Sequence, residues 1–169
     1  MSRTLTPSIV ARALLTMASA VEAATAREAS CFCGAVKLRV AASPPPLAVS
    51  ICHCSTCRKL TGSPMLANLM LPAKALDVPD DAALVSQATS KYVTRHRCAA
   101  CYSPTFARLG KDKVVVPLAL FDAPHPETWV PQQHIYYDQR VLDVNDGLPK
   151  FRAHFGSEQC ADDGSPKTD

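Results

Sequence analysis

The stretch Cys52-His53-Cys54-Ser55-Thr56-Cys57 brings three thiols together within six residues of a 169-residue chain. Cysteines two or three positions apart can turn around one metal ion, and zinc takes four such soft ligands in a tetrahedron. This stretch therefore offers three zinc ligands and leaves the fourth position open. An open position is typical of zinc sites that perform chemistry, so we predict a catalytic zinc site from Cys52, Cys54 and Cys57.

Two further cysteine pairs flank this stretch, Cys31-Phe32-Cys33 before it and Cys98-Ala99-Ala100-Cys101 after it. Four thiolates make a closed structural zinc site, so we predict that these pairs share a second zinc ion and tie an early strand to a later hairpin. The alternative is a disulfide framework, because the chain has eight cysteines, an even number. The spacing favours metal, and a domain of this size does not need disulfides to be stable.

The eighth cysteine, Cys160, stands alone in a polar segment near the end of the chain. We expect it to be a free thiol. The alternative is that it supplies the fourth ligand of the open site.

Charge and composition exclude several classes of protein. Hydrophobic residues make up 47% of the chain, which is enough for a packed core and excludes wholesale disorder. The formal net charge of +3 is small and its Lys and Arg residues are scattered, so the chain gives no strong nucleic-acid signal. Seven thiolates and two zinc ions would bring this charge to zero. Arg12 and the prolines interrupt every long apolar stretch, so we expect no membrane span.

The body of the chain, residues 29–155, reads as a mostly-β domain. Fourteen prolines against six glycines favour short strands and irregular loops. Apolar runs and alternating patterns predict strands over 36–40, 47–51, 65–71, 91–94, 105–108, 114–120 and 134–137. Asp146-Gly147-Leu148-Pro149 is typical of a turn. Residues 156–169 form a polar C-terminal tail.

Residues 1–28 form a separate N-terminal extension that is rich in Ala, Ser and Thr and has no acid before Glu22. Val10, Leu14, Met17 and Val21 recur at helical spacing. The extension is therefore an organelle transit peptide, a secretory signal with Ala18-Ser19-Ala20 as its cleavage site, or an N-terminal helix.

The order and spacing of five motifs resemble the family of glutathione-dependent formaldehyde-activating enzymes, which includes the centromere protein V type. These motifs are Cys31 to Val36, Cys52 to Lys59, Thr61 to Pro64, Cys98 to Pro104 and Asp146 to Pro149. The resemblance covers residues 30–152. It implies a β-tent fold of short strands built around two zinc sites, structural at Cys31, Cys33, Cys98 and Cys101 and catalytic at Cys52, Cys54 and Cys57.

The sequence departs from the family pattern directly after the second cysteine of the later pair. The family usually has glycine there, and this chain has Tyr102. Glycine is favoured because zinc-binding turns often need left-handed backbone, which costs another residue about 1 kcal/mol or more. The only tryptophan, Trp129, is not at the family's usual late position, and Phe121-Asp122 stands where Leu-Asp is common.

The resemblance implies the condensation of glutathione with formaldehyde to S-(hydroxymethyl)glutathione, a carbon–sulfur lyase activity. Three thiolates on zinc give a centre of net charge −1, which activates water poorly but suits the binding of a further thiol. Arg58 and Lys59 are the candidate receptors for the carboxylates of glutathione or a similar small thiol adduct, or else simply solvated charges. His53 is expected to be a supporting or surface residue rather than a base for a cysteine nucleophile.

Two alternative functions are compatible with the sequence. The first is a non-catalytic zinc module of a larger assembly, with a protein partner bound through the N-terminal extension. The second is an extracellular disulfide protein. The zinc hypotheses place it in a reducing intracellular compartment, either cytoplasmic or mitochondrial.

Overall fold

The structure is a computed structural model that describes residues 26–167. The predicted N-terminal extension lies outside these residues except for its last three positions. Strands hold 37% and helices 13% of the chain, which confirms the prediction of a mostly-β fold. No helix among the described residues is long and apolar enough to cross a membrane.

A small antiparallel sheet contains β1 (Arg27–Ser30), β2 (Lys37–Val40) and β5 (Leu76–Asp77). Leu38 and Val40 of β2 are buried while Lys37 and Arg39 are exposed, as the alternating pattern predicts. The turn between β1 and β2 carries Cys31 and Cys33. The small sheet therefore presents one of the cysteine pairs at its end.

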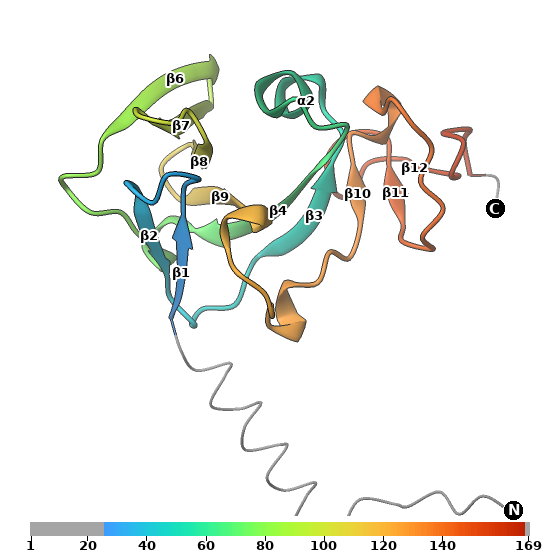
Figure 1. The fold of residues 1–169 in the computed structure, drawn as a ribbon. Helices are drawn as coiled ribbons and strands as arrows, with labels where there is room; N and C mark the ends of the chain where they lie inside the picture. The colour runs from blue at the N-terminus through green and yellow to red at the C-terminus, as the bar shows by residue number, and fades with distance from the viewer. Residues whose placement is uncertain (1–25, 168–169) are drawn as a thin grey trace, which may run out of the picture.

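A large sheet contains the other strands of the described chain, in the order β12-β11-β10-β3-β4-β9-β8-β7-β6. In Figure 1 this order runs from β12 on the right to β9, and then upward through β8, β7 and β6 on the left. Its bounds are β3 (Ala48–Cys52), β4 (Leu66–Pro72), β6 (Leu84–Ser90), β7 (Val93–Cys98), β8 (Pro104–Leu109), β9 (Lys113–Pro117), β10 (His134–Ile135), β11 (Lys150–Phe151) and β12 (Gln159–Cys160). The pairs are antiparallel except that β10 runs parallel to both β3 and β11.

One core joins the two sheets. Leu38 and Val40 of the small sheet belong to the same buried cluster as Leu69 and Val116 of the large sheet. Trp129 and Phe121 close this cluster from the connection between β9 and β10, with ring centroids 4.8 Å apart in an edge-to-face arrangement. That connection contains the short 3-10 helices η2 (Leu118–Leu120) and η3 (Glu127–Trp129), and η1 (Ala73–Ala75) precedes β5.

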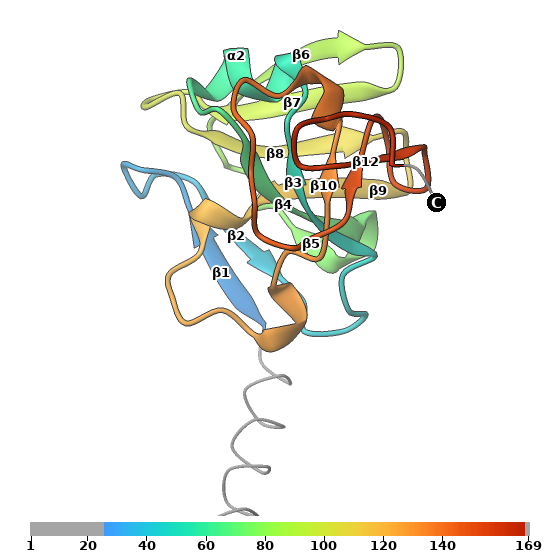
Figure 2. The ribbon, with the colours of Figure 1, turned by 90° about the vertical axis from the view of Figure 1, so that its right-hand side faces the viewer.

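A short helix, α2 (Ser55–Thr61), follows β3 directly and is not among the elements that the sequence predicts. The Cys54 thiol accepts a hydrogen bond from the Cys57 amide and so caps the N-terminus of α2, a role usually taken by Ser, Thr, Asp or Asn. Gly62, with φ of 70°, ends the helix in the left-handed region. Figure 2 shows α2 at the same end of the molecule as β6 and β7.

Several strand predictions need correction at their ends. The predicted segment 114–120 is β9 followed by η2, and 134–137 is β10 followed by η4 (Tyr137–Gln139). β7 runs to Cys98 rather than ending at Thr94, and β6 is not predicted at all. Within the C-terminal tail, β12 pairs with β11 and buries Cys160.

Candidate metal centres

The first candidate centre has four thiols from two loops. Cys31 and Cys33 lie in the turn after β1, and Cys98 and Cys101 lie at the end of β7 and in the turn to β8; their sulfur atoms all lie within 4.8 Å of one another. The Sγ atoms of Cys33 and Cys31 are 3.5 Å apart, and those of Cys33 and Cys98 are 3.8 Å apart. A tetrahedral zinc ion with Zn–S bonds of about 2.3 Å would separate its sulfur ligands by about 3.8 Å. The four thiols therefore fit a zinc ion.

Backbone hydrogen bonds shape the two loops around this centre. The Tyr102 amide donates to the Cys98 carbonyl at 3.0 Å, and the Val36 amide donates to Cys31 Sγ at 3.3 Å. The tight turn forces Tyr102 into the left-handed region, with φ of 59°. Tyr102, in place of the family's glycine, therefore strains the backbone of this turn. Its ring is exposed, so packing of the ring offsets little of that strain.

The second candidate centre has three thiols. Cys52 ends β3, Cys54 caps α2 and Cys57 lies in the first turn of α2; their sulfur atoms also lie within 4.8 Å of one another. No fourth His, Cys, Asp or Glu of residues 26–167 joins this group. Cys52 and Cys57 are buried while Cys54 is partly exposed. The donor set therefore fits a zinc ion with one position left for another ligand.

The three thiols are not equivalent as acids. Hydrogen bonds from the Cys52 and Cys57 thiols, together with the Cys57 amide, lower the pKa of Cys54 to about 2 despite its partial burial. Hydrogen bonds with Cys54 and Cys57, together with burial, raise the pKa of Cys52. The arrangement thus favours one thiolate at Cys54 before any ion binds, and a metal ion would deprotonate the others.

Arg95 of β7 reaches this second centre from a distant part of the sequence. Its Nη2 lies 3.7 Å from Cys57 Sγ, and its Nε donates to Thr89 Oγ1 at 3.2 Å, which orients the guanidinium. The sequence analysis did not single out Arg95, because its contact with Cys57 depends on how β7 packs beside α2. A positive charge here offsets the negative charge of the thiolates.

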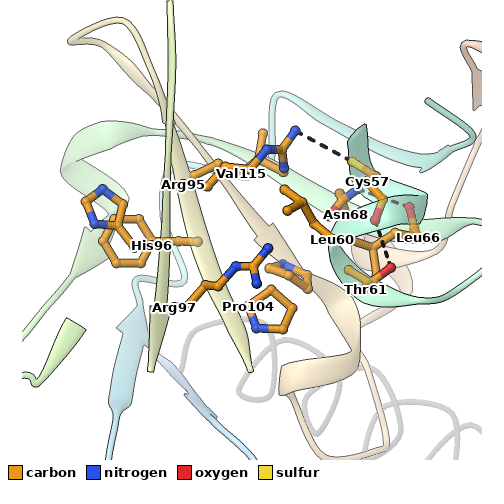
Figure 3. A pocket seen from close by; sticks show the side chains of 13 residues that line it. Cys57, Leu60, Thr61, Leu66, Asn68, Arg95, His96, Arg97, Pro104 and Val115 are labelled. Carbon is orange, nitrogen blue, oxygen red and sulfur yellow. Dashed lines mark hydrogen bonds between the residues drawn. The ribbon is translucent and has the colours of Figure 1, made fainter. Parts of the chain in front are cut away.

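A small, partly open hollow lies beside Cys57, between α2 and the strands β7 and β8. Figure 3 shows Arg95 and Arg97 extending from β7 toward α2, whereas His96 points the other way. His96 stacks on Phe106, with ring centroids 4.2 Å apart. The hollow is lined by Cys57, Leu60, Thr61, Leu66, Asn68, Arg95, His96, Arg97, Pro104, Phe106, Ala107, Val115 and Pro117.

His53 lies between two ligands of the second centre, but its ring belongs to a different network. His53 is fully buried, and its Nε2 lies 2.8 Å from His134 Nδ1. His134 Nε2 in turn lies 2.8 Å from an Asp146 carboxylate oxygen, and Asp146 also pairs with the buried Lys150. Burial and the neighbouring His134 lower the pKa of His53 to about 4, which keeps the ring neutral. His53 is thus a supporting residue and not a surface one.

Arg58 and Lys59, the residues predicted to bind the carboxylates, lie outside the hollow beside Cys57. Arg58 donates from Nε to the His53 carbonyl at 3.1 Å, and Lys59 is exposed. Both line a separate, shallow hollow with Gly62, Ser63, Pro64 and Val141. Neither lines the hollow beside Cys57.

Tyr136 is a further residue that the sequence analysis missed. It is half-buried and has left-handed backbone, with φ of 55°, at the start of η4. Burial and the nearby charges of Cys52, Cys54 and Cys57 raise the pKa of its phenol, so it keeps its proton at neutral pH. A strained residue beside a reactive centre is a common feature of functional sites.

All eight cysteines are free thiols in this structure, so the alternative disulfide framework is not formed. Cys160 is buried in β12, where its thiol donates to the Lys150 carbonyl at 3.7 Å. It belongs to neither thiol cluster, which removes the alternative that it completes the open site.

The comparison with protein families agrees with these features. The family model described as glutathione-dependent formaldehyde-activating enzyme matches residues 26–139, a segment that contains both thiol clusters. No curated protein matches the chain. Among solved structures, the crystal structure of a Rhodobacter sphaeroides protein is 21% identical, with coverage of 59% of this chain and 91% of that protein and a TM-score of 0.46.

Proposed function

Because this chain belongs to the family of glutathione-dependent formaldehyde-activating enzymes, we propose that it is a zinc-dependent carbon–sulfur lyase. It joins glutathione to formaldehyde or cleaves the S-(hydroxymethyl)glutathione adduct. In the forward direction a carbon–sulfur bond forms, the carbonyl π bond breaks, and the thiol proton ends on the new hydroxyl group. The observation that carries the proposal is a cluster of three thiols beside an open hollow, with no fourth ligand among the described residues.

Cys52, Cys54 and Cys57 would hold the catalytic zinc ion, and Cys31, Cys33, Cys98 and Cys101 a structural one. When bound at the three-cysteine site, zinc supplies a positive charge that lowers the pKa of a coordinated thiol. The apolar side chains of the hollow exclude water from the reacting sulfur, and Arg95 offsets the negative charge of the ligands. Tyr136 holds its proton beside the cluster, as a neutral hydrogen-bond donor.

The remaining parts of the hypothesis follow from the chemistry of the thiols. Seven cysteines that act as ligands need a reducing compartment, so we place the protein in the cytoplasm or the mitochondrion. Arg58 and Lys59 stay our sequence-based candidates for substrate binding, at the rim formed by α2.

The test combines metal content with an assay of the zinc-loaded full chain. We expect two zinc ions per chain, one for each cluster, and one ion per chain in the Cys57→Ser variant. Wild type should accelerate the formation of S-(hydroxymethyl)glutathione above the spontaneous rate, and Cys57→Ser should not. Cys160→Ala serves as the matched cysteine control, since Cys160 belongs to neither cluster. Two bound zinc ions without any acceleration would contradict the lyase activity.

One observation favours the second candidate, a non-catalytic zinc module that binds a protein partner. The side chains of Phe32 and Tyr102 are 92% and 65% exposed, and they lie on the two loops of the four-cysteine centre. The Phe32 amide donates to Ser103 Oγ, which holds these loops together. If the assay fails, replacement of both aromatic residues by Ser should abolish partner binding without changing zinc content.

A further inference from the structure

β7 carries two arginines into the hollow beside Cys57, and their guanidinium groups differ in their hydrogen-bond partners. Arg95 contacts Cys57 Sγ and Thr89 Oγ1. Arg97 Nη2 is buried and has no hydrogen-bond partner within residues 26–167. Neither arginine forms an ion pair with a carboxylate of the described chain. Arg97 therefore has a buried donor that no group of the described chain satisfies.

The surroundings of Arg97 strengthen its attraction for an anion. Among the described residues that line the hollow, none is acidic, and several are apolar, including Leu60, Leu66, Phe106 and Val115. Charges attract more strongly beside apolar walls than in water. A guanidinium also offers parallel N–H donors that match the two oxygens of a carboxylate.

The charge balance of the site separates the roles of the two arginines. Three thiolates and one zinc ion together carry a charge of −1. Arg95, in contact with Cys57, offsets that charge. The charge of Arg97, two residues further along the same face of β7, is left without a counterpart.

We propose that Arg97 binds a carboxylate of the substrate, so that the site selects thiols that carry a carboxylate group. This inference rests on the proposed function, which places the sulfur of the substrate at the three-cysteine centre. One carboxylate of the substrate then lies at Arg97 in the hollow shown in Figure 3, while its sulfur lies at the three-cysteine centre. This assignment of Arg97 differs from the sequence-based expectation, in which Arg58 and Lys59 bind the carboxylates.

The first experiment measures binding without chemistry. S-methylglutathione keeps both carboxylates of glutathione but has no thiol, so its binding does not need a thiolate on the metal, and the comparison with Arg97→Gln isolates the contact with Arg97. By calorimetry with the zinc-loaded full chain, we expect Arg97→Gln to weaken its binding about tenfold or more and Arg97→Lys to weaken it less. Lys113→Gln, which removes one positive charge from an exposed position of β9, should bind as wild type does.

The second experiment measures the choice between thiols. In the adduct assay, Arg97→Gln should raise the KM for glutathione about tenfold while the rate with neutral 2-mercaptoethanol stays unchanged. Zinc content and melting temperature equal to those of wild type show that the variant is folded. Lys59→Gln, measured in the same assay, tests whether Lys59 binds the carboxylate instead of Arg97.

The outcomes separate this inference from the proposed function. If S-methylglutathione does not bind to wild type, or binds to Arg97→Gln within twofold of wild type, the carboxylate subsite is wrong. If binding depends on Arg97 but no protein accelerates the adduct reaction, the subsite stands and the lyase activity fails. If wild type and Arg97→Gln catalyse equally with both thiols, the lyase stands and the subsite fails.

Discussion

Tyr102 holds a backbone conformation that glycine adopts at lower cost. Its φ is 59°, its ring is 65% exposed, and the hydrogen bond from its amide to the Cys98 carbonyl fixes the turn. We expect Tyr102→Gly to raise the free energy of unfolding by about 0.5–1 kcal/mol, since relief of left-handed strain exceeds the entropy that glycine adds to the unfolded chain. The melting temperature of the zinc-loaded protein should rise by roughly 1–4 °C. Tyr102→Ala removes the same ring but keeps Cβ, so a gain of equal size in this variant would contradict the backbone explanation.

Arg95 is the residue whose removal tests the electrostatics of the three-cysteine centre. Its guanidinium lies 3.7 Å from Cys57 Sγ. Loss of a hydrogen bond to a charged group typically costs about 1.5–3 kcal/mol, so Arg95→Gln should lower kcat/KM roughly tenfold or more. Arg95→Lys should recover part of the rate because it restores the charge. Equal rates for wild type and Arg95→Gln at equal zinc content would show that this contact has no part in the reaction.

The cysteine ligands and Arg95 differ in how far the sequence could reveal them. Cys52, Cys54 and Cys57 are close in sequence, so their spacing alone indicates a shared metal ion. Arg95 and Cys57 are 38 positions apart and meet only because β7 packs beside α2. The position of Arg97 beside Cys57 could not be predicted for the same reason, whereas Arg58 and Lys59 follow Cys57 directly in the sequence.

At the level of elements, the pair of the buried His134 and the partly exposed Asp146 connects the turn before β11 to the strand end that carries Cys52. His134 of β10 lies opposite Ile51 of β3, while Asp146 pairs with His134 at 2.8 Å and with Lys150 at 3.1 Å. Lys150 also pairs with Asp162 at 2.8 Å. Three segments of the C-terminal third are thereby joined beside the three-cysteine centre through polar and charged contacts.

This network predicts a pH-dependent loss of stability in Asp146→Asn. Burial raises the pKa of Asp146, but hydrogen bonds from His134, the Leu148 amide and Lys150 outweigh it and lower the pKa to about 2. A lowered pKa stabilises the folded state above the unfolded pKa of about 3.8, and that stabilisation is lost as the pH falls toward 2. Because the carboxylate is 32% exposed, we expect a cost of about 1–2 kcal/mol at pH 7.

The measurement is the difference in unfolding free energy between wild type and Asp146→Asn in urea across this pH range. Both proteins lose zinc on acidification, so only the difference between them is diagnostic. The difference should shrink below about pH 4. A difference that stays constant down to pH 2.5 would mean that the carboxylate charge plays no part.

The elements themselves were predictable where burial imposes a pattern. β2 buries every second residue, and β4 is a mostly apolar run with no exposed residue, so the sequence shows both. β6 lies at the edge of the large sheet with most of its side chains exposed, so nothing in its apolar pattern indicates a strand. α2 is too short for helical periodicity and depends on a Cys54 thiol cap, which is not a usual helix-start signal.

For the whole molecule, the mostly-β class follows from composition and short apolar runs, but the sheet order does not. The parallel pairing of β10 with β3 joins residues more than eighty positions apart, and no local pattern specifies it. The four-cysteine centre is a long-range link that the sequence does show, because its two pairs carry metal-ligand spacing. It joins the hairpin of the small sheet to the β7–β8 turn of the large sheet.

The two centres should therefore contribute unequally to global stability. Cys33 and Cys98 are 65 positions apart, and a cross-link of that span restricts the unfolded chain by about 4 kcal/mol. Cys52, Cys54 and Cys57 lie within one short stretch, which can hold an ion in the unfolded chain as well and so stabilises the fold little. We expect Cys98→Ser to lower the melting temperature by roughly 10 °C and Cys54→Ser by only a few degrees. Each variant should retain one zinc ion per chain, so metal content is matched while the position of the lost ion differs. Equal destabilisation by the two substitutions would show that the four-cysteine centre is not the link between the sheets.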